Sequence, residues 1–119
     1  METDRRTLLY AIRQYVHTKE IRYRYRINPR QLTILTSLYY LEILNPQKNR
    51  VSKSMIQKIN PQINQVTIYR DLDLLESRDL MVQRWVNSKR IELSTTKEGR
   101  RIIESLYSLR AIDDLLNED

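Results

Sequence analysis

The chain has 119 residues, no cysteine, one histidine and a net charge of +6, and 40% of its residues are hydrophobic and 30% charged. This length allows one domain with a modest core, and the lack of cysteine excludes disulfides, thiolate metal sites and cysteine nucleophiles. No apolar run reaches the ~20 residues that cross a bilayer, and the first residues do not begin a signal peptide, so we expect a cytoplasmic protein.

The positive charge is concentrated in the first half of the chain. Residues 1–58 hold 12 basic and 4 acidic side chains, a balance of +8, whereas residues 59–119 hold 9 and 11, a balance of −2. A basic surface favours a polyanionic partner through phosphate neutralisation. His17 stands alone, and the pair Asp71 and Asp73 is interpreted as a solvated helix face. Without convergent partners these groups form no catalytic or metal site, so we expect no enzyme activity, metal or cofactor.

Helical spacing opens the chain. Leu8, Ile12 and Val16 recur at four-residue steps after a possible cap at Thr3-Asp4, which predicts a helix over about residues 4–19. The following stretch, "EIRYRYRINP" at residues 20–29, alternates apolar or aromatic residues with arginine.

An extended conformation of that stretch places all three arginines, Arg22, Arg24 and Arg26, on one side, whereas a helix turns Arg24 away from the other two. We therefore predict an extended segment. The arginine row either follows a phosphate track, as a possible contact to the DNA backbone, or is a solvated basic face that discourages edge pairing.

Two helices and a turn come next. Asn28 as cap and Pro29 at the first helical position predict a helix that ends near Leu44, with a buried face formed by Leu32, Leu35, Leu38, Tyr39 and Ile43. Arg50-Val51 is a candidate for a very short strand.

Ser52 is placed to cap a helix over residues 53–59, and the break at residues 60–64 contains a proline. The stretch "QVTIYRDLDLLESRDL" then has Ile68, Leu72 and Leu75 on one face, with the intervening residues directed elsewhere. A short helix, a tight break and a second helix predict a helix-turn-helix.

The pattern then changes to alternation. "LMVQRWV", "NSK" and "RIELS" predict two strands joined by a polar turn. Trp85 is expected to pack against the helices, with stacking on a base as the alternative. Thr95 as cap and Glu98 three residues later predict a capping box and a final helix that runs to about residue 116. This helix carries more apolar residues than a small core covers, so a partner chain is the expected cover.

The order helix, helix-turn-helix, hairpin, helix resembles the winged-helix regulators of the MarR and PadR families. "TIYRDLDLLESRDLM" is similar to a PadR-type recognition helix, and "NSKRIELSTTKEG" to the MarR and PadR segment in which the wing runs into a helix. The ferric-uptake regulators carry a related Thr-aliphatic-Tyr-Arg run, but their metal-binding histidines and cysteines are missing here. The sequence departs from the families at Asp79, where glycine is usual, and at Asn87, where MarR proteins have aspartate.

The resemblance implies a mainly α fold with a small β-hairpin, a winged helix-turn-helix with N- and C-terminal dimerisation helices. We expect a single domain, with residues 1–28 as N-terminal helix and basic extended segment, 29–94 as helix-turn-helix and wing, and 95–119 as dimerisation helix. A recognition helix in the major groove and a wing on the minor groove or backbone give the expected DNA contacts. These are Ser52, Lys53, Ser54, Gln65, Val66, Thr67, Tyr69, Arg70, Arg84, Lys89 and Arg90.

The expected function is sequence-specific binding of double-stranded DNA by a homodimeric transcriptional regulator, with a small-molecule effector possible but not identified by any residue set. A mobile-element accessory protein for replication or transfer, or a winged helix used for protein contacts, remains an alternative. The expected dimer surface consists of Leu8, Ile12, Val16, Ile102, Leu106, Leu109 and Ile112.

Overall fold

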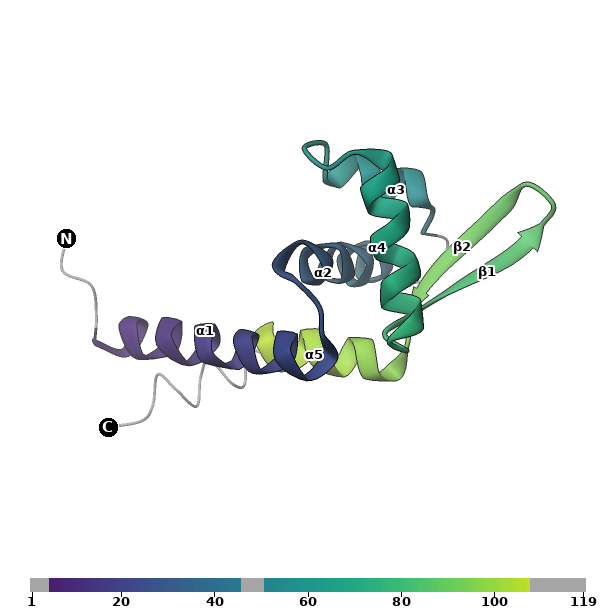
Figure 1. The fold of residues 1–119 in the computed structure, drawn as a ribbon. Coiled ribbons are helices and arrows are strands. Elements are labelled where there is room, and N and C mark those ends of the chain that lie inside the picture. The colour runs from purple at the N-terminus through teal and green to yellow at the C-terminus, as the bar shows by residue number, and fades with distance from the viewer. Residues whose placement is uncertain (1–4, 46–50, 108–119) are drawn as a thin grey trace.

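A computed structural model describes residues 5–45 and 51–107 of the chain. Within these residues, five helices and a two-stranded antiparallel sheet follow one another in the predicted order (Figure 1). The elements are α1 (Arg5–Tyr25), α2 (Pro29–Leu44), α3 (Lys53–Ile59), α4 (Gln65–Ser77), β1 (Met81–Asn87), β2 (Arg90–Thr95) and α5 (Lys97–Tyr107). In the described residues, no helix is long and apolar enough to cross a membrane.

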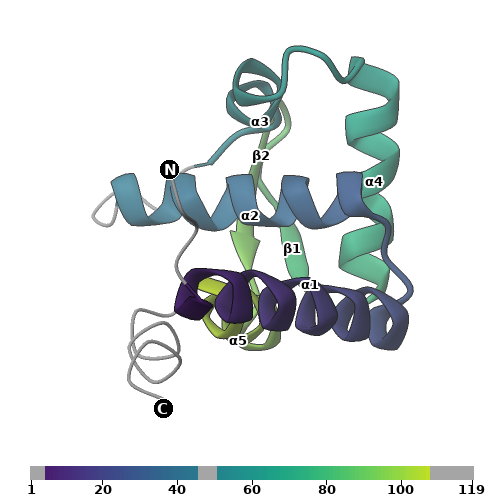
Figure 2. The same ribbon diagram turned by 90° about the vertical axis from the view of Figure 1, so that its left-hand side faces the viewer.

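Helix α2 runs through the middle of the molecule, with α1 and α5 on one side and α3 on the other (Figure 2). The predicted start is confirmed: the Asn28 side chain accepts a hydrogen bond from the Gln31 N–H at 2.8 Å, and the Gln31 side chain accepts one from the Asn28 N–H at 2.9 Å. The predicted buried face is correct for its three leucines but wrong at Ile43, which is 61% exposed. The central position of α2 buries a wider arc, which includes Ile34 and Leu41.

The prediction of an extended segment at residues 20–27 is wrong. Helix α1 continues to Tyr25, and Arg26 then adopts a positive φ of 55° while the Ile27 N–H bonds to the Arg22 carbonyl at 3.0 Å. A residue in the left-handed conformation commonly ends a helix, because the chain then turns back and its N–H groups bond to carbonyl groups of the last turn. Ile21 and Ile27 are buried in the core, and this burial outweighs the period-two alternation of the sequence.

The hairpin is confirmed. Strands β1 and β2 pair from Met81 opposite Thr95 to Asn87 opposite Arg90, and a bulge lies between Trp85 and Asn87. Val51 forms an isolated bridge with Leu93, with the Leu93 N–H donating to the Val51 carbonyl at 2.8 Å. The predicted short strand is therefore a single bridging residue in the described part, since Arg50 lies outside the described residues.

The cap of α5 is Thr96, and the prediction of Thr95 is wrong by one residue. The Thr96 hydroxyl accepts from the Gly99 N–H at 3.0 Å. Thr95 instead ends β2, where its N–H and hydroxyl both donate to the Glu42 carboxylate, at 2.5 and 2.8 Å. Glu98 accepts from Arg101 and Tyr25 and does not close a capping box.

The turn between α4 and β1 places Asp79 at a positive φ of 59°, which explains why glycine is usual at this position in the families that the sequence resembles. Asp79 is one of the few residues that tolerates this conformation. Beyond it, α5 passes so close to the backbone that a Cβ on Gly99 would lie 2.1 Å from the Leu80 carbonyl oxygen. The corner between recognition helix, wing and α5 is therefore tightly packed.

The expected dimer surface is only partly available. Ile102 and Leu106 are 3% and 4% exposed, because α1 and α2 of the same chain cover this side of α5. The expectation that a partner chain covers them is therefore wrong. Leu8, Ile12 and Val16 remain exposed on α1 at 52%, 59% and 47%. Leu109 and Ile112 lie outside the described residues.

Candidate nucleic-acid interface

The recognition helix α4 is fixed at its start by Asn64, whose side chain accepts from the Thr67 N–H at 2.8 Å. Ile68, Leu72 and Leu75 are fully buried, so the opposite side of α4 is directed outward. In Figure 1, α4 lies on the side of the molecule from which the hairpin also projects. The helix thus presents one side to the core and the other to solvent.

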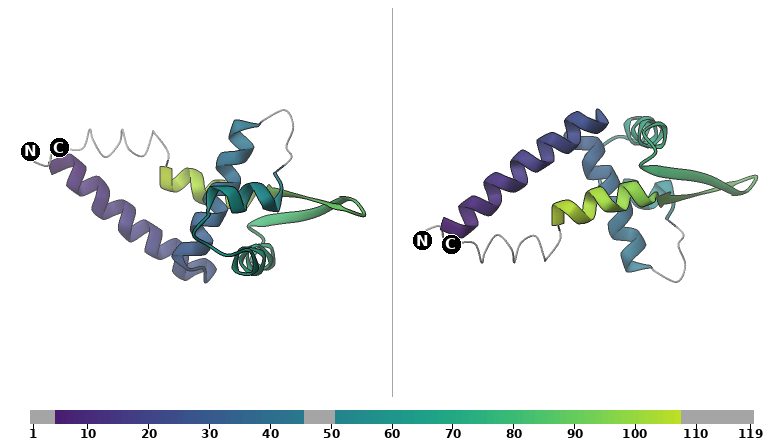
Figure 3. Two further views of the ribbon diagram at one scale, coloured as in Figure 1. Left: turned by 90° about the horizontal axis from the view of Figure 1, so that it is seen from above. Right: turned by 90° about the horizontal axis from the view of Figure 1, so that it is seen from below.

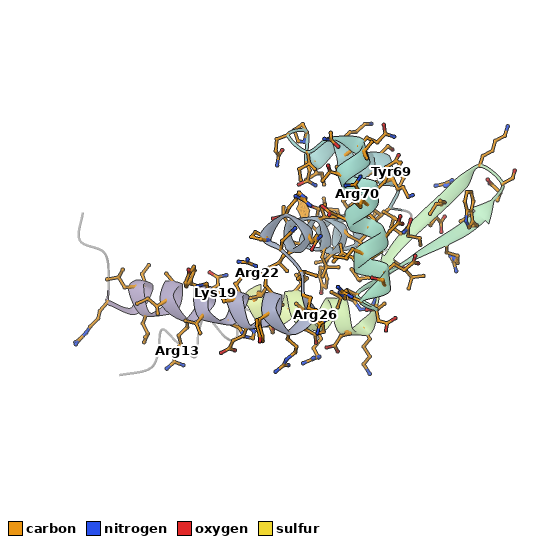
Figure 4. The ribbon with its side chains drawn as sticks, in the orientation of Figure 1. Arg13, Lys19, Arg22, Arg26, Tyr69 and Arg70 are labelled. Atoms are coloured by element: carbon orange, nitrogen blue, oxygen red, sulfur yellow. The ribbon has the colours of Figure 1, made fainter. Side chains whose placement is uncertain are left out.

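Of the residues expected to read DNA on α4, Gln65, Val66 and Arg70 are exposed, and Thr67 and Tyr69 are half-buried. Val66 has 65% of its surface exposed, a high value for an apolar side chain. Figure 4 shows Tyr69 and Arg70 together on α4. The outward side chains lie in the first two turns of the helix, which are the turns that contact base edges in a helix-turn-helix protein.

Tyr69 is held by two neighbours. The Gln65 side-chain amide donates to the Tyr69 hydroxyl at 2.9 Å, and the Lys53 ammonium lies 4.4 Å from the centre of the Tyr69 ring. A cation over an aromatic ring is attracted by the electron-rich face. The sequence assigned Lys53 to α3 and Tyr69 to α4 without a link between them. The structure joins the two helices of the motif at the exposed surface.

A buried ion pair anchors α4 from behind. Asp71 is 2% exposed and accepts from the Arg30 Nε at 2.6 Å, the Arg30 Nη2 at 3.0 Å and the Gln31 amide at 3.1 Å. Burial raises the pKa of Asp71, but the hydrogen bonds from Arg30 and Gln31 outweigh it, and the pKa lies below its usual value. The carboxylate is therefore charged at neutral pH and ties the recognition helix to the start of α2.

The interpretation of Asp71 as solvated is thus wrong, and the sequence did contain a signal. Asp71 lies three residues after Ile68 and four before Leu75, so it falls on the apolar side of the helix. A carboxylate on that side requires a cation from another element. Its neighbour Asp73 is exposed, as expected, and accepts from the Gln83 amide at 2.7 Å.

The start of α3 faces the same region. The Ser52 hydroxyl caps the helix by accepting from the Met55 N–H at 3.3 Å, and it lies 3.0 Å from the Ser54 hydroxyl. Lys53 is half-buried and contacts the Tyr69 ring, while Ser54 is exposed. Two hydroxyls and one ammonium at the first turn can donate to phosphate oxygens.

The wing is braced at its base and open at its tip. The Gln83 N–H donates to Glu76 of α4 at 2.8 Å, so the first strand is fastened to the recognition helix. At the tip, the Asn87 side chain accepts from the Lys89 N–H at 2.9 Å, which shapes the turn. Lys89 and Arg90 are exposed, as the sequence predicts for cations that contact DNA.

On the strands of the wing, Arg84 has a 75% exposed side chain and forms an ion pair with Glu92 at 3.3 Å. The expectation that Trp85 packs against the helices is wrong, because this side chain is 66% exposed.

The arginines of α1 do not form a row. Figure 4 shows Arg13, Lys19, Arg22 and Arg26 spread along and around the helix. Arg24 and Arg26 are exposed, whereas Arg22 is half-buried with its Nε buried. Within the described residues, no group of three histidine, aspartate or glutamate side chains is placed to hold a metal ion.

A helix-turn-helix followed by a braced hairpin and a covering helix defines the winged helix-turn-helix fold, and the predicted fold class is confirmed. Solved structures of S. aureus MepR share it. The MepR–DNA complex matches with a TM-score of 0.62 and 18% identity over 89% of this chain and 73% of that one. A phenylalanine-to-leucine MepR mutant bound to an oligodeoxyribonucleotide matches with a TM-score of 0.61 and 18% identity, over 95% and 80% of the two chains.

A glycine-to-lysine MepR mutant gives a TM-score of 0.59 and 20% identity over 94% of this chain and 80% of that one. No family model matches the chain, and no curated protein matches its sequence. The comparisons therefore support the resemblance to winged-helix regulators at the level of the fold.

Proposed function

We propose that the chain is a homodimeric, sequence-specific double-stranded DNA-binding protein that regulates transcription in the cytoplasm. The observation that carries this proposal is the exposure of Gln65, Val66 and Arg70 in the first turns of a helix that Asp71 anchors from behind, in a chain whose wing also carries exposed cations. The structural likeness to MepR, which was solved in complex with DNA, supports double-stranded DNA as the partner of this chain.

Each exposed group has a chemical role in the proposed complex. Arg70 can bond bidentately to guanine and Gln65 to adenine, and Val66 can pack on a thymine methyl. The Tyr69 hydroxyl accepts from Gln65 and its ring contacts Lys53. In the proposed complex Tyr69 therefore contacts phosphate or positions Gln65, and it does not read a base. Ser54, Lys89 and Arg90 bind backbone or minor-groove atoms, and these contacts carry no direct base information.

The proposed dimer uses the exposed side of α1, at Leu8, Ile12 and Val16. These residues lie on one face of the helix at four-residue spacing, and an apolar face of this kind is normally covered. A two-fold dimer presents two recognition helices to half-sites about 34 Å apart, so the bound site is pseudo-palindromic. The helix α1 extends away from the wing, which leaves the DNA-binding side free (Figure 3).

Of the three arginines assigned to the DNA backbone, Arg24 and Arg26 are the exposed ones and keep that role in the proposal. Arg22 instead lines a groove of about 880 Å³ between α1 and α2, together with Leu32, Thr33, Tyr40 and Leu44. That groove is the place in which a small-molecule effector would bind.

The proposal is tested by selecting bound duplexes from a random pool and measuring the salt dependence of binding to the selected site. Arg70→Ala should lower affinity for the selected site and relax the preference at one base position, because each bidentate contact contributes about 1–3 kcal/mol of discrimination. Lys89→Ala should weaken binding to selected and random duplexes alike and reduce the salt slope by about 1. Lys19→Ala removes the same charge on α1, away from α4 (Figure 4), and serves as control.

Equal binding by wild type, Arg70→Ala and Lys89→Ala would refute the proposed surface. Sedimentation tests the dimer separately. The wild type should be dimeric at micromolar concentration, and Ile12→Glu should shift it toward monomer because a charge would be buried in the apolar contact. A wild-type chain that stays monomeric at high micromolar concentration would contradict the dimer.

A further inference from the structure

The wing carries an exposed aromatic side chain that the function proposed above does not use. Trp85, the single tryptophan of the chain, lies on β1 opposite Ile91 and is 66% exposed. The next residue, Val86, is 49% exposed. Tryptophan is rarely left this open, because its large ring gains more than other side chains from leaving water.

The position of Trp85 in the hairpin register explains its exposure. Alternate residues of β1 share one face with their cross-strand partners, so Met81, Gln83 and Trp85 lie on the same face as Thr95, Leu93 and Ile91. Close to the helices this face is core, with Met81 and Leu93 each 1% exposed. Farther out the hairpin leaves the helical body (Figures 1 and 3), and the apolar face continues into solvent.

The charges around this apolar face indicate what covers it. Lys89 and Arg90 at the tip are exposed, whereas Arg84 lies on the opposite face of the strand from Trp85 and pairs with Glu92. The core of a protein–protein contact is depleted of charge. Cations beside an exposed aromatic ring instead fit a polyanion that also has apolar walls.

The minor groove of duplex DNA has both the negative charge and the apolar walls that such a surface requires. Its floor and walls are base edges and sugars between two lines of phosphates, and it is about 7.5 Å deep. Trp85 lies two residues before the end of β1, which corresponds to about 7 Å along a strand. A wing whose tip enters the groove therefore brings the indole ring to the groove entrance or walls.

We propose that Trp85 is the apolar contact of the wing with duplex DNA, packing on the sugar walls of the minor groove while Lys89 and Arg90 bind the phosphates beside it. This inference rests on the proposed function and adds to it a residue that supplies affinity through apolar contact. Aromatic and apolar side chains that enter the minor groove act in this way in other DNA-binding proteins, where they exclude water and distort base steps.

The single tryptophan makes the contact directly measurable. Selective tryptophan fluorescence is quenched with acrylamide in the free protein and in complex with a selected duplex, while DNA binding is followed independently by the anisotropy of a labelled duplex. The free protein should be strongly quenched, and the complex should be protected. Trp85→Ala should weaken binding about tenfold, as expected for the loss of one aromatic contact with nucleic acid.

The control is Tyr40→Ala, which removes another exposed aromatic, 51% exposed on α2 and outside the proposed DNA and dimer contacts. It should bind as the wild type does. Because Trp85 is exposed, its replacement should leave the thermal midpoint unchanged, so weaker binding cannot be attributed to unfolding.

Three results would overturn the inference. The first is a duplex bound by anisotropy while Trp85 remains as open to acrylamide as in the free protein. The second is undiminished affinity of Trp85→Ala. The third is protection of Trp85 without DNA that grows with protein concentration, which would show that a second copy covers it. The first two leave the proposed function standing, whereas an absence of duplex binding by the wild type would remove both.

Discussion

The ion pair behind the recognition helix gives a prediction whose size follows from the structure. Asp71→Asn keeps the shape of the side chain but removes its charge and turns an amide donor toward the Arg30 guanidinium. Asp71 accepts three hydrogen bonds in the wild type, and bonds to a charged group contribute about 1.5–3 kcal/mol each in favourable cases. Arg30 is 43% exposed, so water recovers part of the loss when the carboxylate is removed.

We therefore expect Asp71→Asn to lower the free energy of unfolding by about 2 kcal/mol, the contribution of roughly one such bond. For a domain of this size that corresponds to a fall of about 8 °C in the thermal midpoint. Urea unfolding monitored by circular dichroism measures the change in the free energy of unfolding. Both proteins are compared at one fixed concentration, because association would shift the urea midpoint.

The pH dependence gives this prediction a second, independent test. The folded-state pKa of Asp71 lies below the unfolded value, so the carboxylate stabilises the fold above a pH of about 4 and this contribution is lost as the pH falls through the lower folded-state pKa. The stability gap between wild type and Asp71→Asn should therefore close on acidification.

A double-mutant cycle with Arg30→Gln identifies the partner. The two substitutions should be strongly non-additive, because either one removes the same pair. Additivity within about 0.5 kcal/mol, or a gap that stays constant down to low pH, would refute the assigned role of the pair.

Three further predictions concern the elements around the recognition helix. Gly99→Ala should destabilise the chain by about 3 kcal/mol or more, since its Cβ would meet the Leu80 carbonyl oxygen at 2.1 Å and overpacking against backbone has no cheap relief; an unchanged urea midpoint would contradict this. Asn64→Ala should cost about 1 kcal/mol through loss of the α4 cap, whereas Asn64→Ser should restore most of it. Arg101 and then Tyr25 lower the pKa of Glu98 to about 2, so Tyr25→Phe should raise that pKa while Arg101 still keeps it below normal; a carboxyl NMR titration that shows no change would exclude the Tyr25 contribution.

Local signals in the sequence were sufficient where cause and effect are close together in the chain. Asn28 and Ser52 cap their helices through bonds to residues three positions later, and both caps were predicted correctly from the sequence. Asn64 caps α4 in the same way at the end of the predicted break, although it was not predicted as a cap. The buried side of α4 and the alternation of the hairpin were also predicted correctly. The order of these elements, together with the resemblance of two motifs to MarR and PadR regulators, predicted the winged helix-turn-helix fold.

The sequence failed where two local conformations were both acceptable. Alternating tyrosine and arginine at residues 22–26 suits a strand, yet residues 22–25 form the last turn of α1 and Arg26 ends it. The choice depends on Ile21 reaching the core and on the Tyr25 hydroxyl bonding to Glu98, which lies 73 residues away. The prediction of Thr95 as a helix cap was wrong for a similar reason. Its hydroxyl donates to Glu42, 53 residues earlier, and Thr95 belongs to the hairpin.

The candidate interface also has features that the sequence predicted and features that only tertiary contacts decided. The sequence by itself predicted that Gln65, Val66 and Arg70 face outward, because they lie off the apolar stripe of Ile68, Leu72 and Leu75. Only the tertiary structure decided that Asp71 is buried against Arg30, that Lys53 lies over Tyr69, and that Trp85 extends beyond the helices. Each of these facts depends on the distance between elements separated by many residues, and periodicity along the chain carries no information about that distance.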